Sequence, residues 1–159
     1  FVLVSFIGNS FPFICFFYGE FTVKYLGTID SVENFENHCN EIKFLLEKDI
    51  YYHTNRKMID WMNDNFYGVH ARIENLINRF GKYEQSLLFF TKKGGSVRLH
   101  RDSKDFGKTA FSVSSTDFEF IHHNQIYQCK AGNVYTFNSK LIHGIEKIES
   151  DRWCLVWWR

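Results

Sequence analysis

The spacing of hydrophobic residues changes near residue 85 of this 159-residue chain. Before that point apolar residues recur every three or four positions over long runs, which is typical of amphipathic helices. After it they alternate with polar residues over short runs, which is typical of half-buried strands. We therefore expect a single domain over residues 1–159, in which a strand and helical support region, 1–84, precedes a β-rich core, 85–159.

After residue 18, the support region is predicted to contain one strand and three helices. The strand covers 20–28. The helices cover 30–48, 55–65 and 69–80. Asp30 is expected to cap the first helix while Glu33 reaches back toward it. Gly81 is expected to end the third helix, because glycine readily adopts the left-handed conformation found after a helix.

Residues 1–18 are very apolar, but Gly8, Asn9, Ser10 and Pro12 interrupt them and no basic residue lies among them. A membrane helix needs about 20 apolar residues without such interruption. We therefore predict two short buried strands around a turn in this segment, rather than a signal peptide or a membrane anchor.

The core contains eight short β-rich runs separated by turn residues. They cover 85–91, 96–102, 109–114, 117–121, 125–129, 133–137, 142–148 and 152–158. Eight such strands after a helical segment predict a double-stranded β-helix, which is a cupin-like jelly roll. The predicted class is α+β, mainly β, with the N-terminal helices packed on one sheet.

The charges are nearly balanced, with 19 basic and 18 acidic side chains. There is no excess of basic residues, so we expect no obligate nucleic-acid partner, and we also expect no membrane partner. The four cysteines lack the paired spacing of zinc sites: Cys15, Cys39, Cys129 and Cys154. We interpret them as free thiols in a reducing compartment, which predicts a cytoplasmic location.

His100, Asp102 and His143 form a candidate metal centre. Side chains alternate along a strand, so His100 and Asp102 are expected to point to the same face. Two imidazoles and one carboxylate can occupy one face of an Fe(II) ion and leave the opposite positions open. We therefore predict that these three residues bind a metal and are catalytic.

Two arginines are candidates for binding a co-substrate. Arg152 is expected to face into the barrel, together with Cys154, Val156 and Trp158. The alternate residues of that strand are expected to pack outside: Trp153, Leu155 and Trp157. The same alternation would turn Val97 and Leu99 toward the helices and Arg98 toward the metal centre, so Arg98 is a tentative second binding residue.

Four stretches resemble the superfamily of 2-oxoglutarate- and Fe(II)-dependent oxygenases. Residues 91–102, TKKGGSVRLHRD, resemble the prolyl-hydroxylase-like pattern Y-x-x-G-(x)5-H-x-D. Residues 131–139, AGNVYTFNS, resemble the stretch that precedes the distal histidine. Residues 143–148, HGIEKI, and 151–155, DRWCL, resemble that histidine and the basic strand that binds 2-oxoglutarate. The C-terminal part of the sequence also resembles the aspartyl/asparaginyl- and free-proline-hydroxylase branch of this superfamily.

This resemblance implies ligands, co-substrates and a reaction. It implies that His100, Asp102 and His143 bind Fe(II), and that Arg152 binds the distal carboxylate of 2-oxoglutarate. With O2 as the second co-substrate, the reaction would couple decarboxylation of 2-oxoglutarate to succinate with hydroxylation of an amino acid, a prolyl peptide or another small molecule. Thr91 stands where many relatives have a tyrosine that contacts 2-oxoglutarate.

Other functions compete with this one. A cupin-like metal enzyme, or a non-catalytic ligand-binding jelly roll, would share the fold without using 2-oxoglutarate and would not need Arg152. A related halogenase would lack the carboxylate ligand, so Asp102 favours hydroxylation. Residues 100–107 contain kinase-like H-R-D-x-K and D-F-G strings, but the two adjoin and no glycine-rich loop precedes them.

The remaining histidines and Lys108 are expected to have structural or surface positions. His122 and His123 are adjacent, so on a strand they would face opposite ways, and we expect them at a loop or rim. The histidines of the helical region are expected to be surface or packing residues: His38, His53 and His70. Lys108 is expected to be solvated.

Overall fold

The computed structural model describes residues 22–45, 51–53, 56–59 and 67–159. Its elements are, in chain order, β1 (Lys24–Thr28), α1 (Val32–Leu45), β2 (Tyr51–His53), β3 (Arg56–Ile59), α2 (Tyr67–Asn78), β4 (Gln85–Thr91), β5 (Val97–His100), β6 (Thr109–Ser114), β7 (Phe118–His122), β8 (Gln125–Cys129), β9 (Asn133–Asn138), β10 (His143–Ile145) and β11 (Arg152–Trp158). The predicted strands of the core are all present, and four of them have the predicted bounds: β4, β6, β8 and β11.

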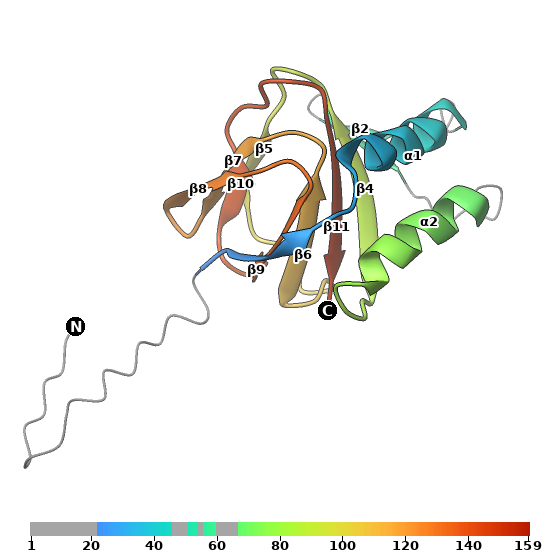
Figure 1. The fold of residues 1–159 in the computed structure, drawn as a ribbon. Coiled ribbons are helices and arrows are strands. Elements are labelled where there is room, and N and C mark those ends of the chain that lie inside the picture. Colours follow the sequence, from blue (N-terminus) through green and yellow to red (C-terminus); the bar gives the residue numbers. More distant parts are fainter. Residues whose placement is uncertain (1–21, 46–50, 54–55, 60–66) are drawn as a thin grey trace, which may run out of the picture.

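The strands form two antiparallel sheets. A seven-stranded sheet has the order β1-β9-β6-β11-β4-β3-β2, and a four-stranded sheet has the order β5-β10-β7-β8. Both helices lie on one side of the large sheet, beside β4 and β11, and the small sheet lies on its other side (Figure 1). The predicted fold class, a mainly β jelly roll with helices packed on one sheet, is therefore confirmed.

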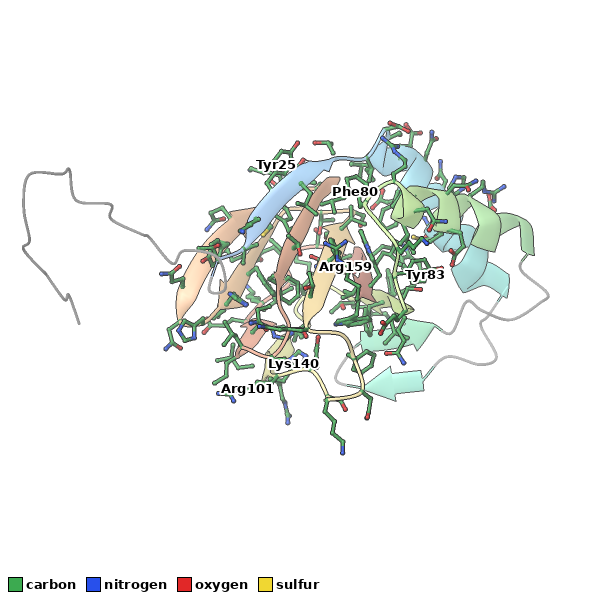
Figure 2. All side chains as sticks on the ribbon, turned by 90° about the horizontal axis from the view of Figure 1, so that it is seen from below. Tyr25, Phe80, Tyr83, Arg101, Lys140 and Arg159 are labelled. Carbon is green, nitrogen blue, oxygen red and sulfur yellow. The ribbon has the colours of Figure 1, made fainter. Side chains whose placement is uncertain are left out.

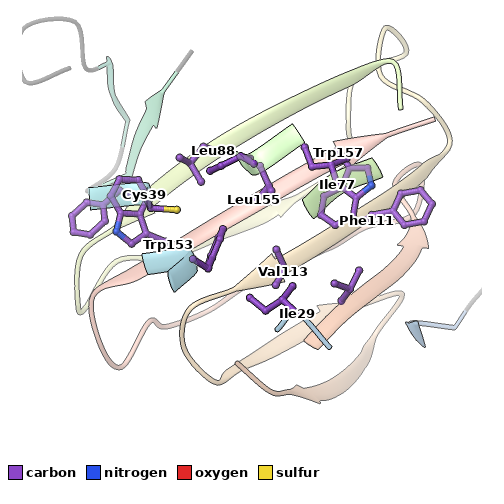
Figure 3. Packing of buried hydrophobic residues seen from close by; sticks show 13 residues of the cluster. Ile29, Cys39, Ile77, Leu88, Phe111, Val113, Trp153, Leu155 and Trp157 are labelled. Atoms are coloured by element: carbon purple, nitrogen blue, oxygen red, sulfur yellow. The ribbon is translucent and has the colours of Figure 1, made fainter. Parts of the chain in front are cut away.

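The helices and the outer face of the large sheet enclose one apolar core (Figure 3). From β11, Trp153, Leu155 and Trp157 enter this core, as the alternation of the strand predicted. Ile73 and Ile77 of α2 face them and are almost fully buried. Buried area of this kind supplies most of the free energy of folding.

A second apolar cluster lies between the two sheets. Phe120, Phe137, Ile145 and Trp158 are among its buried members. Because these residues come from both sheets, the cluster holds the small sheet against the inner face of the large one. The candidate site is built into the same interior.

The prediction of a helix over 55–65 is wrong where the structure describes that segment. Residues Arg56–Ile59 form β3, which pairs with β4 from Arg56 opposite Thr91 to Ile59 opposite Leu88. The apolar spacing of such a short segment suits a strand as well as a helix, and pairing with the exposed edge of β4 decides between them. Residues 60–66 lie outside the described part.

The start of α1 also differs from prediction, because Ser31 rather than Asp30 caps the helix. The backbone N–H of Asn34 donates to Ser31 Oγ at 3.1 Å, which is the geometry of a serine cap. Asp30 instead accepts a hydrogen bond from Arg79 at 2.6 Å, just beyond the end of α2. Gly81 has φ of 117° and follows α2 as predicted.

Some predictions fall on parts of the chain outside the described residues, namely the two strands within 1–18 and the thiol of Cys15. Cys39, Cys129 and Cys154 are buried free thiols. Burial raises the pKa of the Cys129 thiol to about 12. In the described part of the chain, neither helix has the length and apolar character required to cross a membrane.

Candidate metal centre

His100, Asp102 and His143 converge at the inner face of the small sheet. His100 ends β5 and lies directly opposite His143 of β10 in the sheet register. Asp102 follows β5, and its Oδ1 lies 3.3 Å from His100 Nε2 and 3.4 Å from His143 Nε2. One ligand atom from each residue lies within 4.8 Å of the other two. The structure thus brings together the three residues predicted as metal ligands.

Both imidazoles have a fixed orientation. His100 Nδ1 lies 2.7 Å from the carbonyl oxygen of Arg98, and His143 Nδ1 lies 2.8 Å from that of Leu141. A carbonyl oxygen only accepts, so each Nδ1 carries the proton and donates it. In a neutral imidazole the lone pair is then on Nε2, the atom that faces Asp102, as in many metal-binding histidines.

Asp102 is held by the rest of the fold as an ionised carboxylate. Its Oδ2 accepts a hydrogen bond of 2.7 Å from the indole Nε1 of Trp158, so Oδ1 alone faces the two imidazoles. Burial by itself would raise the pKa of Asp102, but the contacts with His100, His143 and Trp158 hold that pKa well below its usual value. Asp102 therefore presents a charged oxygen to the centre.

The turn at residues 138–142 connects two of the three ligand positions, Asp102 and His143. Its Ser139 carbonyl accepts the backbone N–H of Asp102 at 3.0 Å, and its Leu141 carbonyl accepts Nδ1 of His143. The β5–β6 connection and β10 are thereby bonded to the same few residues. The relative position of Asp102 and His143 is therefore set by hydrogen bonds to the carbonyl groups of a single turn.

Lys140, in the middle of that turn, holds the β5–β6 connection in place. Its Nζ donates to the carbonyl oxygens of Ser103 at 2.5 Å and Phe106 at 2.8 Å. The hydroxyl of Ser139 donates to the carbonyl oxygen of Gly107 at 2.7 Å. These bonds fix the segment that carries Asp102 at both its start and its end.

The arrangement fits a divalent transition metal. Ligands about 2.1 Å from one ion and at right angles to each other are about 3 Å apart, close to the 3.3 and 3.4 Å observed here. Two neutral imidazoles and one carboxylate form the donor set of non-haem Fe(II) sites, which leave coordination positions for other molecules. The donor chemistry and the fixed Nε2 atoms both suit such an ion.

Arg152 begins β11 and is 3% exposed. Its Nε donates to Ser114 Oγ at 2.7 Å, and its guanidinium carbon lies 4.2 Å from the centre of the Phe118 ring. Among the described residues, no acidic side chain lies within ion-pair distance of this guanidinium. A buried cation is costly unless it is paired, so this position suits an anionic ligand.

A cavity of about 250 Å³ connects the two features. Its lining includes the three candidate ligands together with Arg152 from β11. Apolar and aromatic side chains form most of the remaining wall: Leu87, Phe89, Val97, Phe106, Phe118, Phe120, Phe137, Ile145, Val156 and Trp158. A mostly apolar cavity with few charged groups is typical of a small-molecule site.

Solved structures with a similar fold include two prolyl hydroxylases and the protein HygX. A viral collagen prolyl hydroxylase from Paramecium bursaria Chlorella virus-1, in complex with 2-oxoglutarate, matches with a TM-score of 0.58 at 14% identity over 87% of this chain and 95% of its own. A Pseudomonas putida prolyl-4-hydroxylase matches with a TM-score of 0.55 at 14% identity over 86% and 91%. HygX from Streptomyces hygroscopicus, with nickel, 2-oxoglutarate and hygromycin B bound, matches with a TM-score of 0.60 at 11% identity over 85% and 81%.

The chain has the fold of the 2-oxoglutarate- and Fe(II)-dependent oxygenases. At these identities the likeness establishes the fold and not the activity. No protein-family model matches the sequence, and no curated protein matches it. The resemblance predicted from the four sequence stretches is confirmed at the level of the oxygenase fold.

The oxygenase-like core departs from prediction at β5, where the alternation of side chains is broken. His143 pairs with His100 and Ile145 with Val97, so two residues of β5 lie opposite the single Gly144. This bulge turns Val97 into the cavity beside His100, and it leaves Arg98 exposed and outside the cavity wall. Leu99 is 54% exposed instead of packing on the helices, which cover the other sheet. The predicted inward direction of Arg98 is therefore wrong.

Gly144 is required by the same bulge. A Cβ atom at this position would lie 2.6 Å from the carbonyl oxygen of Val97, closer than real contacts allow. The backbones of β5 and β10 can approach this closely only where no side chain intervenes. The glycine after the distal histidine thus helps to set the distance between the two imidazoles.

Three residues of the site have roles that local sequence patterns do not predict. Trp158 was expected to face inward, but its bond to Asp102 depends on a contact between distant strands. Ser114 holds Arg152 in the same way. His122 was expected at a rim, but it is fully buried behind His143 and its Nε2 donates to the carbonyl oxygen of Asn138 at 3.0 Å. His123 is exposed, with a φ of 48°, in the β7–β8 turn.

Proposed function

We propose that this chain is an Fe(II)- and 2-oxoglutarate-dependent dioxygenase that hydroxylates an amino acid, a prolyl peptide or another small molecule. The observation that carries the proposal is the position of Arg152. It places a buried cation, without an acidic partner among the described residues, in the wall of the cavity that also contains the His100, Asp102 and His143 group.

Each residue has a defined task in this proposal. His100 and His143 would present Nε2, and Asp102 would present Oδ1, to one Fe(II) ion. Arg152 would bind the distal carboxylate of 2-oxoglutarate in a charge-assisted pair, and Ser114 would keep the guanidinium oriented. When bound, the iron and 2-oxoglutarate supply the oxidation chemistry: O2 and 2-oxoglutarate give succinate and CO2, and one oxygen atom enters a C–H bond of the substrate.

The chain's own residues would also exclude water and direct the reaction. The aromatic wall surrounds the centre with apolar surface, which limits access of solvent to the reacting groups. Asp102 occupies the position that a halogenase would leave open for halide, which supports hydroxylation over halogenation. The buried Arg152 supports use of 2-oxoglutarate over a cupin-like site that lacks it.

The direct test is stabilisation by 2-oxoglutarate in the presence of Mn(II) or Fe(II) without oxygen. Binding to the native state alone, at about 100 times the dissociation constant, adds roughly 2.7 kcal/mol. For a domain near this size we expect Tm to rise by several degrees, at about 2–4 °C per kcal/mol. Arg152→Ala should remove most of the rise due to 2-oxoglutarate and keep the rise due to metal alone.

Arg98→Ala is the matched control, because it removes an arginine that the structure places outside the cavity. It should bind 2-oxoglutarate like the unaltered protein. Metal binding without any response to 2-oxoglutarate would contradict the proposal and favour a metal-binding jelly roll of another type. With O2 added, formation of succinate across a panel of amino acids and prolyl peptides would then identify the substrate.

A further inference from the structure

Arg101 is the second arginine in the wall of the cavity, and the proposed function gives it no role in binding 2-oxoglutarate. It lies between the two ligands His100 and Asp102 in sequence, lines the cavity and has an exposed side chain, so it lies at the opening. Figure 2 shows Arg101 at the same edge of the molecule as Lys140, the residue that holds the β5–β6 connection.

The other charged groups of the cavity do not neutralise the positive charge of Arg101. Besides Arg101, the charged groups of the wall are Asp102 and Arg152, with the two histidines as metal ligands. If the proposed function holds, the charges of Fe(II), Asp102, Arg152 and doubly charged 2-oxoglutarate cancel one another. Arg101 then remains as a positive charge at the opening of a largely apolar cavity.

The neighbouring acidic groups do not neutralise it. Among the described residues, no acidic side chain lies within ion-pair distance of Arg101. The nearby Asp105 carboxylate accepts a hydrogen bond from Ser103 Oγ at 2.9 Å. The same segment carries further exposed basic residues, Lys104 and Lys108, so the potential at the opening is positive and would attract anions.

We propose that Arg101 binds an acidic group of the substrate, and that the substrate is a small organic acid with an apolar skeleton and a carboxylate or phosphate. This inference rests on the proposed function, because it assigns Arg152 to 2-oxoglutarate. The acid would sit at the opening on the guanidinium of Arg101, and the skeleton would extend along Val97 and Phe106 toward the metal centre. An arginine can bind either kind of acid through paired hydrogen bonds.

The test uses matched acidic and neutral probes with one skeleton. The protein is loaded with Fe(II) and saturating 2-oxoglutarate without oxygen, and loading is verified first by the rise in Tm. Binding of hexanoate and hexanamide, and of hexyl phosphate and hexanol, is then measured by calorimetry. We expect each acid to bind roughly tenfold more tightly than its neutral counterpart, or better, since a hydrogen bond to a charged group contributes about 1.5–3 kcal/mol.

Three variants locate the acid. Arg101→Gln should abolish the preference for acids, and Arg101→Lys should keep part of it. Lys104→Gln removes an equal charge from the same segment, outside the cavity wall, and should leave the preference intact. A preference for carboxylate over phosphate, or the reverse, would show which acid the opening accepts.

Several results would overturn the inference. In a correctly loaded protein, equal binding of acids and neutral probes would do so, as would equal effects of Arg101→Gln and Lys104→Gln. Acids displaced by added 2-oxoglutarate would be bound at Arg152 and would also contradict it. A protein that fails the loading step, in contrast, would overturn the proposed function itself and this inference with it.

Discussion

The two faces of β11 share one backbone and are both buried, but only the inner face carries a charged side chain, Arg152. On the outer face, Trp157 is fully buried and stacks on Phe111, with ring centres 5.5 Å apart. On the inner face, Arg152 is almost as deeply buried, yet it is a cation with no acidic partner among the described residues. Burial of the Trp157 indole thus stabilises the fold, whereas burial of the Arg152 charge destabilises it.

The outer face of β11 therefore contains residues that stabilise the fold, and the inner face contains residues that form the candidate binding site. The outer face of β11 contributes Trp153, Leu155 and Trp157 to the apolar core, and their burial stabilises the fold in proportion to apolar area. The inner face retains the buried charge of Arg152 and lines the cavity that also contains His100, Asp102 and His143, and a buried unpaired charge costs stability. Substitutions on the two faces should therefore affect different measurements.

The largest effect is expected from Trp157→Ala on the outer face. Removing a buried indole from the packing of Phe80 and Phe111 should lower the free energy of unfolding by about 3–5 kcal/mol. Urea unfolding followed by circular dichroism measures this loss. At low urea the folded fraction should still bind metal and 2-oxoglutarate, and a folded protein that had lost both would break the separation of the faces.

Trp158→Phe on the inner face should act on the metal instead. It removes the indole N–H that donates to Asp102 Oδ2. Loss of a residue that orients a metal ligand by a hydrogen bond typically lowers the affinity for the metal about 10–100-fold. We expect metal binding, measured by competition with a chelator, to weaken by about that factor. Trp153→Phe is the matched control, because its indole donates at 3.1 Å to Asn40 of α1 on the other face. Equal losses of metal affinity in both variants would contradict the assignment.

Arg152→Met, in contrast to Trp157→Ala, should not lower the free energy of unfolding. It replaces an unpaired buried cation with an apolar side chain, so without metal and 2-oxoglutarate the free energy of unfolding should stay constant or rise, by on the order of 1 kcal/mol. The same variant should lose stabilisation by 2-oxoglutarate. A fall of about 2 kcal/mol or more would mean that the contacts with Ser114 and Phe118 outweigh the cost of burying the charge.

The smallest effect is expected from Arg98→Gln. Its side chain is exposed and lies outside the cavity wall, so stability should change by about 0.5 kcal/mol or less. The affinity for 2-oxoglutarate, measured by calorimetry, should be unchanged. A clear loss of affinity would show that the bulge of β5 rearranges in the bound state.

The sequence predicted the core strands and the candidate ligands because both depend on local patterns. Alternation alone placed Trp153, Leu155 and Trp157 on the helices and Arg152 in the cavity. The convergence of His100 and His143 followed from motif spacing combined with the resemblance to a known fold. The residues placed correctly by alternation lie in β11, which pairs regularly with both of its neighbours, so the direction of each side chain follows from its position.

The errors arose where a distant strand decides the local structure. The strand β3 forms because the edge of β4 is available to pair with it. The residues 56–59 alone do not predict a strand. The bulge of β5 depends on Gly144, which lies far along the chain, and it reversed the expected directions of Val97 and Arg98. Likewise, the bond from Trp158 to Asp102 depends on how the two sheets pack.

The hydrogen-bonded turn at residues 138–142 has a consequence for the choice of ion. Because this turn ties Asp102 and His143 together through backbone carbonyls, the hydrogen bonds of the fold itself hold these two donors in place. A set of two imidazoles and one carboxylate accepts several divalent ions, and their affinities generally increase from Mn(II) through Fe(II) and Co(II) to Ni(II). Such a site constrains the coordination geometry of the ion, and the concentrations of the metals around the protein then determine which of them binds.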